Sequence, residues 1–303
     1  MAAGGDVHTV RGMATTVLPP AEPRRRPTIA LAGGAGLRQL GVFAVAYLIY
    51  FGVRAITEGS TGQAVANAWS LIGLERDLGI AWEGALQEAI LGSRVLVDAA
   101  NAVYMYGHWP VLILTGVLLF RYRRQHYFRL RDACLLSGLI GLVIFSLFPV
   151  APPRLTDLPI VDTVTRDDAG YRQIVPPSLV NEYAAMPSFH AGWNLLVGVV
   201  VAGATRHRLL RTLSALVPAS MVIAVVVTAN HYILDVVAGV TIALICLFAR
   251  DRLVRRRRLD RGERRRHSEE PRRRRYGAVP HRAPRRQRSH AAAAGRDTRT
   301  APD

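Results

Sequence analysis

The sequence predicts an all-α fold: a polytopic membrane bundle of six transmembrane helices, with amphipathic interfacial helices between the first and second spans. Half of the 303 residues are hydrophobic, and they occur in long runs that are almost free of charge, as membrane spans require. The basic residues, all of them Arg, gather between these runs and after the last one. Such a distribution is typical of the cytoplasmic side of a membrane protein.

Composition divides the chain into three parts. Residues 1–36 are rich in Gly, Ala, Pro and Thr, which predicts a disordered cytoplasmic N-terminus. Residues 37–249 hold the apolar runs and are expected to form the membrane domain. Residues 250–303 carry 20 Arg against 7 Asp and Glu, a surplus of 13 in the net charge of +17, which predicts a disordered cytoplasmic tail. The tail either contacts anionic lipid headgroups or only fixes the topology, and nucleic acid is the less favoured partner.

The six predicted spans follow the apolar runs in chain order. They are residues 37–56, 95–120, 133–148, 188–204, 213–229 and 231–248. With the N-terminus inside, this threading places the Arg-rich segments 121–131 and 205–212 in the cytoplasm, together with both termini. The segments 57–94 and 149–187 contain more acidic than basic residues and then lie outside. We therefore expect an integral plasma-membrane protein whose active site faces the outer side.

The two outer segments and the second span each have a distinctive composition. In 57–94, acidic residues alternate with Trp and Leu at helical spacing, which is typical of amphipathic helices at an interface. The segment 149–187 is rich in Pro, and loops of this length usually carry function. The second span contains polar residues that are unusual for a lipid-facing helix, His108 among them, and such residues indicate a functional site.

Two motifs at the outer ends of the last three spans predict a reaction centre. MPSFH at residues 186–190 opens the fourth span, and NHYILD at residues 230–235 opens the sixth. Because the fourth and fifth spans are antiparallel, His190 and His231 should meet at the same membrane surface. His231 and Asp235 are four residues apart and share a helix face. An imidazole beside a carboxylate, with a second imidazole opposite, suits nucleophilic and acid–base chemistry.

The same surface is predicted to bind phosphate. Arg154 follows two prolines, which fix its backbone and aim a bidentate phosphate ligand. Ser188 stands at a helix start, which is a capping and anion-binding position. The N-termini of the fourth and sixth spans point at one region and attract phosphate through free N–H groups and the helix dipole. His108 is assigned to substrate binding with Arg154 and Ser188.

Three other interpretations of these residues stay open. The polar residues could serve packing alone, as a pair that braces two helices or as ligands of lipid headgroups. A zinc site is a rival because His-x-x-x-Asp spacing can bind metal, but a third clear ligand is missing, so no metal and no cofactor are expected. A transporter with a His/Asp proton relay is the non-enzymatic alternative. It predicts internal repeats and broken midplane helices, which the sequence does not display.

At these motifs the sequence resembles a known family. Residues 186–190 and 230–235 look like the second and third signature motifs of the type 2 phosphatidic acid phosphatase superfamily. The chain is most similar to the branch of inositol phosphorylceramide synthases and their bacterial relatives, because APPR at 151–154 resembles the first motif of that branch and residues 74–87 fit its upstream helix. The resemblance covers residues 40–248 and implies a membrane enzyme that acts on a lipid phosphate or phospholipid.

The resemblance also implies a role for each site residue. His231 resembles the nucleophile that takes the phosphoryl group as phosphohistidine, and Asp235 orients and charges its imidazole. His190 resembles the general acid for the leaving oxygen and later the base for the acceptor. Ser188 and Arg154 would hold the phosphate oxygens.

Two positions depart from the phosphatase pattern. Phe189 stands where Gly usually precedes the histidine of the second motif, and Val225 stands where an Arg is expected six residues before the nucleophile. The same departure occurs in the lipid phosphotransferase branch. We therefore expect transfer of a phosphoryl group or phospho-headgroup, such as phosphoinositol, to an alcohol acceptor on the outer face. The alternative is a lipid or polyprenyl phosphate phosphatase.

Overall fold

The computed structural model describes residues 33–56, 60–164 and 181–276, and within them the side chains of residues 33–54, 60–164 and 181–261. The regular elements of these ranges are helices, as predicted. The chain forms two compact units, residues 1–251 and 252–303. The candidate site lies wholly within the first unit.

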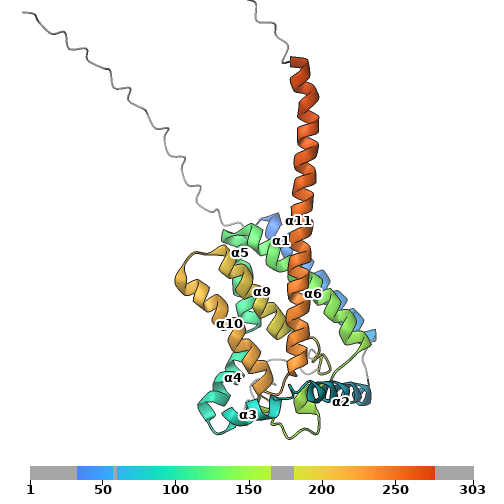
Figure 1. Cartoon of the computed structure of the whole chain (residues 1–303), viewed down its shortest axis with the longest axis vertical. Coiled ribbons are helices and arrows are strands. Elements are labelled where there is room, and N and C mark those ends of the chain that lie inside the picture. The colour runs from blue at the N-terminus through green and yellow to red at the C-terminus, as the bar shows by residue number, and fades with distance from the viewer. Residues whose placement is uncertain (1–32, 57–59, 165–180, 277–303) are drawn as a thin grey trace, which may run out of the picture. The chain divides into compact units, whose positions relative to one another are not determined.

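The helices of the described residues follow one another in chain order (Figure 1). They are α1 Gly34–Ile56, α2 Thr61–Asp77, α3 Glu83–Leu91, α4 Arg94–Tyr106, α5 Trp109–Tyr122, α6 Arg124–Leu147, the 3₁₀ turn η1 Pro153–Leu155, α9 Phe189–Ala204, α10 Arg208–Val227 and α11 Ile233–Tyr276. Helix α9 packs against α5, α6 and α10. The motif that opens α9 is therefore surrounded by other helices rather than by lipid.

Four helices of the described residues are long and apolar enough to cross a membrane. These are Gly34–Arg54, Arg124–Leu147, Arg208–Val227 and Ile233–Arg261. Helices α4 and α5 together form a fifth candidate, which is bent by 47°. Helix α9 is apolar but has 16 residues, fewer than the ~20 that a hydrocarbon core requires. The prediction of a helical membrane bundle is confirmed, while the number of six spans stays a prediction.

The second predicted span is broken where α4 gives way to α5. A Cβ on Gly107 would collide with the backbone of Val103 and lie 3.1 Å from Met221 of α10, so α4 approaches α10 closely here. Pro110 stands in the first turn of α5, where its missing N–H costs nothing. The break turns His108 inward, and its side chain is 3 % exposed. The apolar pattern alone gave no sign of this bend.

Helix α9 is held between α6 and α11 by close backbone contacts. A Cβ on Gly192 would come within 2.5 Å of the carbonyl oxygen of Gly239 on α11, a close approach that only small residues allow. On another side, the ring of Phe189 occupies the space above Gly141 of α6. The start of α9 and the start of α11, which carry the two histidine motifs, are thereby fixed against each other.

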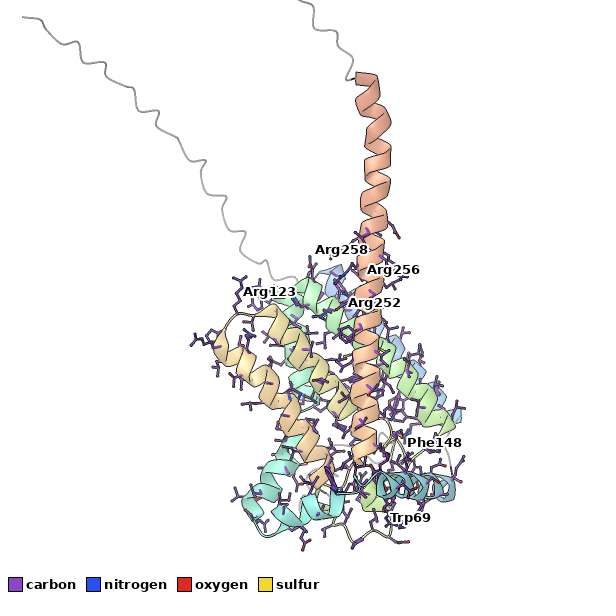
Figure 2. The ribbon with its side chains drawn as sticks, in the orientation of Figure 1. Trp69, Arg123, Phe148, Arg252, Arg256 and Arg258 are labelled. Carbon is purple, nitrogen blue, oxygen red and sulfur yellow. The ribbon has the colours of Figure 1, made fainter. Side chains whose placement is uncertain are left out.

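The two ends of the first unit differ in their side chains. Arg123 lies at the start of α6, whereas Phe148 follows its end, near which Trp69 of α2 lies (Figure 2). At the Arg-rich end, Arg129 of α6 forms an ion pair with Asp251 of α11 at 2.8 Å. Arg at one end of a bundle and aromatic residues at the other suit a cytoplasmic surface and a membrane interface, respectively.

Helices α2 and α3 turn three of their polar side chains inward. Glu75 is 1 %, Glu83 5 % and Gln87 1 % exposed. Large apolar side chains of the same segment are exposed: Trp69, Leu74, Leu78, Trp82 and Leu86. An apolar outer face suits contact with a bilayer, while the buried carboxylates of Glu75 and Glu83 reach the start of α11.

The C-terminal part of α11 extends beyond the expected membrane domain. The helix continues to Tyr276, into the segment that the charge pattern assigns to a disordered tail. Arg and Glu are common in this segment and are good helix formers. The prediction of disorder rests on the net charge alone and does not include this helix propensity. Residues 1–32 and 277–303, where disorder is also expected, lie outside the described residues.

Candidate active site

Three histidines from three elements form a cluster in which His108 and His231 are buried and His190 is half-buried. The ring of His190, in the first turn of α9, lies 5.7 Å from the ring of His231, measured between centroids. On its other side, 4.4 Å away, is the ring of His108 from the break between α4 and α5. His108 and His231 are 3 % and 5 % exposed. The antiparallel arrangement thus brings together the two motif histidines, and the helix break adds the third.

The imidazole of His231 is held by two oxygen atoms on its Nδ1 side. Nδ1 lies 2.8 Å from the carbonyl oxygen of Ala185 and 3.4 Å from Oδ2 of Asp235. A carbonyl oxygen can only accept, so Nδ1 carries the hydrogen and donates it, and the lone pair of the neutral ring is on Nε2. The sequence interpretation gave this orienting role to Asp235 alone; the shorter contact belongs to the Ala185 carbonyl.

Asp235 lies entirely inside the protein. Its Oδ2 accepts a hydrogen bond of 2.9 Å from the backbone N–H of Tyr232, while its Oδ1 has no hydrogen-bond partner among the described residues. The side chain is 0 % exposed. A buried carboxylate beside Nδ1 favours positive charge on the imidazole of His231.

His190 is positioned by its neighbours on three elements. Tyr104 of α4 stacks on its ring at 4.9 Å and 27°. The amide nitrogen of Asn194 donates to the His190 carbonyl at 2.8 Å and to Nδ1 of His108 at 3.0 Å. His108 therefore accepts through Nδ1 and carries its hydrogen on Nε2 when neutral. The amide of Asn194 thereby links the ring of His108 to the backbone of His190.

Arg154 lies beside the residue that precedes His231. Its backbone N–H donates to the carbonyl of Ala229 at 3.0 Å, and its Nη1 donates to Oδ1 of Asn230 at 2.6 Å. Nε lies 3.8 Å from Oδ2 of Asp162. The guanidinium is thus fixed to the turn that carries the second histidine motif, and its side chain keeps 17 % of its surface exposed.

Ser188 joins the two motifs through its backbone and caps α9 with its side chain. Its N–H donates to the carbonyl of Asp235 at 2.9 Å, and its Oγ accepts from the N–H of Ala191 at 3.4 Å. A Cβ on Gly239 would collide with the Ser188 carbonyl, so this contact requires glycine. The predicted capping role is met, and the hydroxyl hydrogen remains able to donate to a phosphate oxygen.

The start of α11 differs from the sequence interpretation. Its N–H groups were expected to face phosphate, but the N–H of Ile233 donates to Oε1 of Glu83 at 3.0 Å, and the N–H of Leu234 donates to Oε1 of Glu75 at 2.7 Å. The N–H of Tyr232 is taken by Asp235. Carboxylates already satisfy the positive end of this helix, so phosphate binding at these groups is ruled out in this arrangement.

The turn between α10 and α11 is strained at one residue. Ala229 has φ 59°, a left-handed conformation that costs a non-glycine residue roughly 1–2 kcal/mol. The turn is nevertheless fixed, because the N–H groups of Asn230 and His231 both donate to the carbonyl of Val225, at 3.1 and 3.0 Å. Strained backbone held by its surroundings is common at functional sites.

Buried amides fix the Pro-rich loop over the site. Gln87 of α3 bonds both the N–H and the carbonyl of Val161, at 2.7 and 2.8 Å, and the carbonyl of Val227 at 2.9 Å. Asn101 of α4 exchanges hydrogen bonds with Thr163. The loop that presents Arg154 is therefore anchored on α3 and α4, and Gln87 also ties α3 to α10. Sequence analysis missed Gln87, although a polar residue within an apolar stretch was the available signal.

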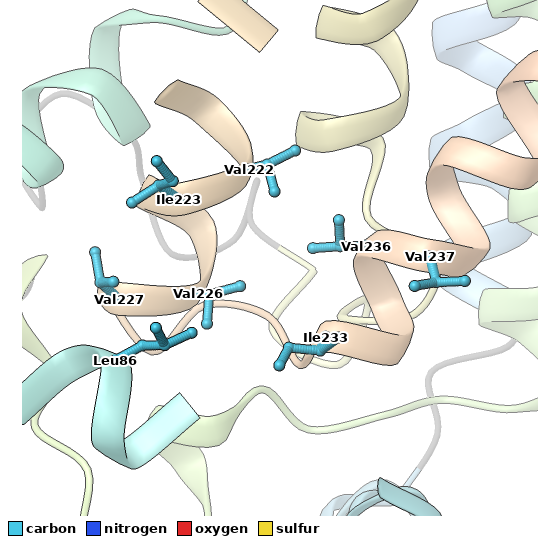
Figure 3. A pocket seen from close by; sticks show the side chains of 8 residues that line it. All are labelled: Leu86, Val222, Ile223, Val226, Val227, Ile233, Val236 and Val237. Carbon is cyan, nitrogen blue, oxygen red and sulfur yellow. The ribbon is translucent and has the colours of Figure 1, made fainter. Parts of the chain in front are cut away.

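An aliphatic pocket of about 190 Å³ lies beside the turn that carries His231 (Figure 3). Side chains of α10 form one side and those of α11 the other, with Leu86 of α3 at the edge (Figure 3). The lining residues are Leu86, Val222, Ile223, Val226, Val227, Ile233, Val236 and Val237. The pocket has the chemistry of a hydrocarbon site and offers nothing to a polar headgroup.

The arrangement can perform phosphoryl chemistry with its own side chains. It combines an imidazole with a free Nε2, a second imidazole within reach of the same substrate, and a guanidinium and a hydroxyl that can bind phosphate oxygens. Within the described residues, no three His, Cys, Asp or Glu side chains are grouped so as to hold a metal ion. All six residues that the sequence singled out, His108, Arg154, Ser188, His190, His231 and Asp235, lie in or against this cluster.

Comparison with known proteins supports the family resemblance. A family model of the PAP2 superfamily matches residues 69–249, which is more than half of the chain and includes all six of these residues. Searches of curated proteins and of solved structures gave no significant match. The matched segment runs from α2 through the membrane part of α11 and contains both histidine motifs. The chain therefore belongs to the PAP2 superfamily and is a membrane enzyme of the phosphatase and phosphotransferase class that this superfamily represents.

Proposed function

We propose that the protein is an integral membrane lipid phosphotransferase that works through a phosphohistidine on His231. One observation carries this proposal: the Nδ1 of His231 is bonded to the Ala185 carbonyl at 2.8 Å, which leaves Nε2 as the nucleophilic atom, with the ring of His190 5.7 Å away. A fixed tautomer beside a second imidazole is what two-step phosphoryl transfer needs.

In the first step, the Nε2 lone pair of His231 attacks phosphorus and the bond to the lipid oxygen breaks. Protonated His190 gives its proton to that leaving oxygen. The phosphorylated ring then carries a positive charge, which the carboxylate of Asp235 stabilises. Arg154 and the hydroxyl of Ser188 bind the phosphate oxygens and neutralise charge in the transition state.

In the second step, His190 is neutral and takes the proton of the acceptor hydroxyl. The acceptor oxygen attacks phosphorus, the bond between phosphorus and Nε2 breaks, and His231 returns to its neutral form. Splitting the reaction replaces one difficult displacement with two in-line steps, each with the same general acid–base residue. His108, whose ring lies 4.4 Å from that of His190, is assigned to the substrate side of this centre.

Transfer to an alcohol, as in the branch similar to inositol phosphorylceramide synthases, is favoured over hydrolysis by Val225. This residue stands where the phosphatase pattern has an Arg, and its side chain is 0 % exposed, so no phosphate ligand comes from α10 at this position. Arg154 supplies positive charge from the loop instead, through its bond to Asn230. The second candidate function is a lipid or polyprenyl phosphate phosphatase, in which water replaces the alcohol.

The proposed membrane topology keeps six spans, with the bent α4–α5 pair as the second and the short α9 as the fourth. The Arg-rich end of the first unit then faces the cytoplasm, and the histidine cluster faces the outer side of the plasma membrane. This orientation is supported by Arg123 at the start of α6 and by the exposed aromatic residue Trp69 at the other end (Figure 2). The Arg-rich tail would also be cytoplasmic, where anionic headgroups are available.

The proposed function is tested with purified protein and a panel of phospholipids, each with and without inositol. A transferase forms a new phospholipid only when the acceptor alcohol is added, and releases little free phosphate. A phosphatase releases free phosphate at the same rate with or without the alcohol. Turnover of neither kind on any lipid phosphate would contradict both functions.

The aliphatic pocket predicts a selective effect on long-chain lipids. Ile223 lines it and is 62 % exposed, whereas Ile245 of α11 is 58 % exposed and outside the pocket. We expect Ile223→Trp to raise KM for a long-chain lipid phosphate about tenfold, equivalent to ~1.4 kcal/mol, because the indole occupies space that the hydrocarbon chain requires. KM for a short-chain soluble analogue should stay unchanged. Ile245→Trp is the matched control, and equal effects of the two variants would show that the pocket takes no substrate chain.

A further inference from the structure

We propose that Glu75 and Glu83 are positioning residues that hold the start of α11, and with it the His231–Asp235 pair, and that Glu75 performs this role with a proton on its carboxyl group. The proposal rests on the proposed function, since the positioned pair is the proposed nucleophile and its partner. It concerns two interfacial-helix residues that no motif includes.

The first support is the pattern of hydrogen bonds at the helix start. The backbone N–H groups of Ile233 and Leu234 have no acceptor within α11 and donate to carboxyl oxygens of other helices. The N–H of Ile233 donates to Glu83 at 3.0 Å, and the N–H of Leu234 donates to Glu75 at 2.7 Å. Ile233 and Leu234 lie between His231 and Asp235 in the chain. Any displacement of the carboxylates therefore moves the backbone that separates the nucleophile from its partner.

The second support is an unpartnered atom. Oε2 of Glu75 is buried and has no hydrogen-bond partner within 3.5 Å in the described part of the chain, although the side chain is only 1 % exposed. An ionised carboxylate would leave a charged oxygen unsatisfied in the interior, which is costly. A carboxylic acid instead carries no charge there, and its proton can be shared with the nearby side chain of Glu83.

The surrounding charges favour the same protonation state. The titratable groups that face Glu75 are Glu83 of α3, Asp235 of α11 and Tyr232 before it, and none of them is basic. Burial raises the pKa of Glu75 to about 8 against the lowering effect of the Leu234 N–H, and Glu83 and Asp235 add to the rise. Burial likewise raises the pKa of Tyr232. Glu75 is thus neutral at pH 7 and becomes negative in mildly alkaline solution.

Ionisation of Glu75 adds a negative charge next to two carboxylates and close to the proposed phosphate site. It repels Glu83 and Asp235, loosens the start of α11 and opposes the binding of an anionic substrate. The wild-type kcat/KM is therefore expected to fall as pH rises past about 8. Glu75→Gln imitates the protonated acid, because its amide oxygen accepts from Leu234 and its amide hydrogen donates to Glu83.

The kinetic test compares three variants across pH 6–10, on a lipid phosphate substrate, in the intact protein. Glu75→Gln should keep kcat at pH 7 within about threefold of wild type, and its kcat/KM should not fall near pH 8. Glu75→Ala should lower kcat about 10- to 100-fold, the usual effect of removing a hydrogen-bond partner that supports a reactive centre. Glu83→Gln should move the fall to lower pH, because one charge that raises the pKa of Glu75 is gone. Glu88→Gln, on the exposed face of α3, is the matched control and should match wild type.

A second readout is independent of catalysis. Glu75 binds a proton in the folded protein between its ordinary pKa of 4.5 and about 8, whereas the unfolded chain has released it, so stability falls as pH rises through this window. The melting temperature of the wild type should therefore fall from pH 5 to pH 9 more steeply than that of Glu75→Gln. The inference would be overturned if wild type and Glu75→Gln showed the same decline of kcat/KM above pH 8 and the same dependence of melting temperature on pH. Absence of turnover in every protein, with the melting difference present, would instead count against the proposed function alone.

Discussion

Replacing His231 with Ala is expected to abolish turnover of every phosphate ester that the enzyme accepts. The variant lacks Nε2, the atom that forms the bond to phosphorus. Neither neighbouring histidine can replace it, because Tyr104 stacks on the ring of His190 and Asn194 holds the ring of His108. Removal of a covalent nucleophile in a comparable two-step enzyme costs on the order of 10⁶-fold in kcat. The measurement is a progress curve on a radiolabelled lipid phosphate and on an activated aryl phosphate.

The matched control for this variant is His207→Ala. His207 is an exposed histidine at the start of α10, at the opposite end of that helix from the site, and its loss should leave kcat unchanged. The folded state of each variant is checked by its melting temperature in detergent. A His231→Ala protein that is folded and keeps more than about a thousandth of the wild-type rate would contradict the proposed nucleophile, given the expected size of the loss.

His190→Ala should divide substrates by their leaving groups. A lipid alkoxide is a poor leaving group and needs a proton, so loss of the general acid should lower kcat about 10²- to 10⁴-fold. An aryl phosphate with an acidic phenol leaves without that proton, and it should still phosphorylate His231 at close to the wild-type rate. The two rates are measured separately, as the burst of phenol release and the turnover of the lipid.

Equal losses on both substrates would show that His190 has another role. Its ring stacks on Tyr104 at 4.9 Å and contacts His108 at 4.4 Å in a tilted arrangement, which makes packing the first alternative. His190→Gln separates the two, because glutamine fills most of the space but cannot act as an acid near neutral pH. Recovery of the lipid reaction by Gln would exclude the acid–base role.

The sequence was sufficient to predict the membrane bundle and the meeting of the two motifs. Long apolar runs and clustered Arg specify spans and loops with little help from tertiary contacts, and an antiparallel helix pair must return its end to the surface where it began. The proximity of His190 and His231, whose ring centroids are 5.7 Å apart, could therefore be predicted without knowing how individual side chains pack. The four-residue spacing of His231 and Asp235 likewise survives into the folded helix, at 3.4 Å.

The supporting contacts could not be predicted in the same way. The Ala185 carbonyl that holds His231 is a backbone atom, so no side-chain pattern announces it. The carboxylates of Glu75 and Glu83 cap a helix about 150 residues later in the chain, and apolar spacing placed them on the polar side of a surface helix. The large apolar side chains of that segment, Trp69 and Leu74 among them, are instead exposed, as in an amphipathic helix whose apolar face enters a bilayer interface.

The apolar runs of the sequence did not predict where each helix begins, ends or bends. Helix α9 has the apolar composition of a membrane span but only 16 residues. Its first residues belong to the candidate site. The α4–α5 pair is bent by 47° at the break that contains His108, next to the close approach of Gly107 to Met221 of α10. Both features arise from packing between helices that are distant in the sequence.

The account is tested most directly by locating the phosphate on the enzyme during turnover. The protein is mixed with a lipid phosphate labelled at phosphorus, quenched in alkaline solution to preserve an acid-labile phosphohistidine, and cleaved into peptides that separate residues 186–190 from residues 230–235. The account predicts label on the peptide that contains His231, lost on addition of the acceptor alcohol as labelled product appears. Label on the peptide that contains His190, or turnover with no labelled protein at any time, would contradict it.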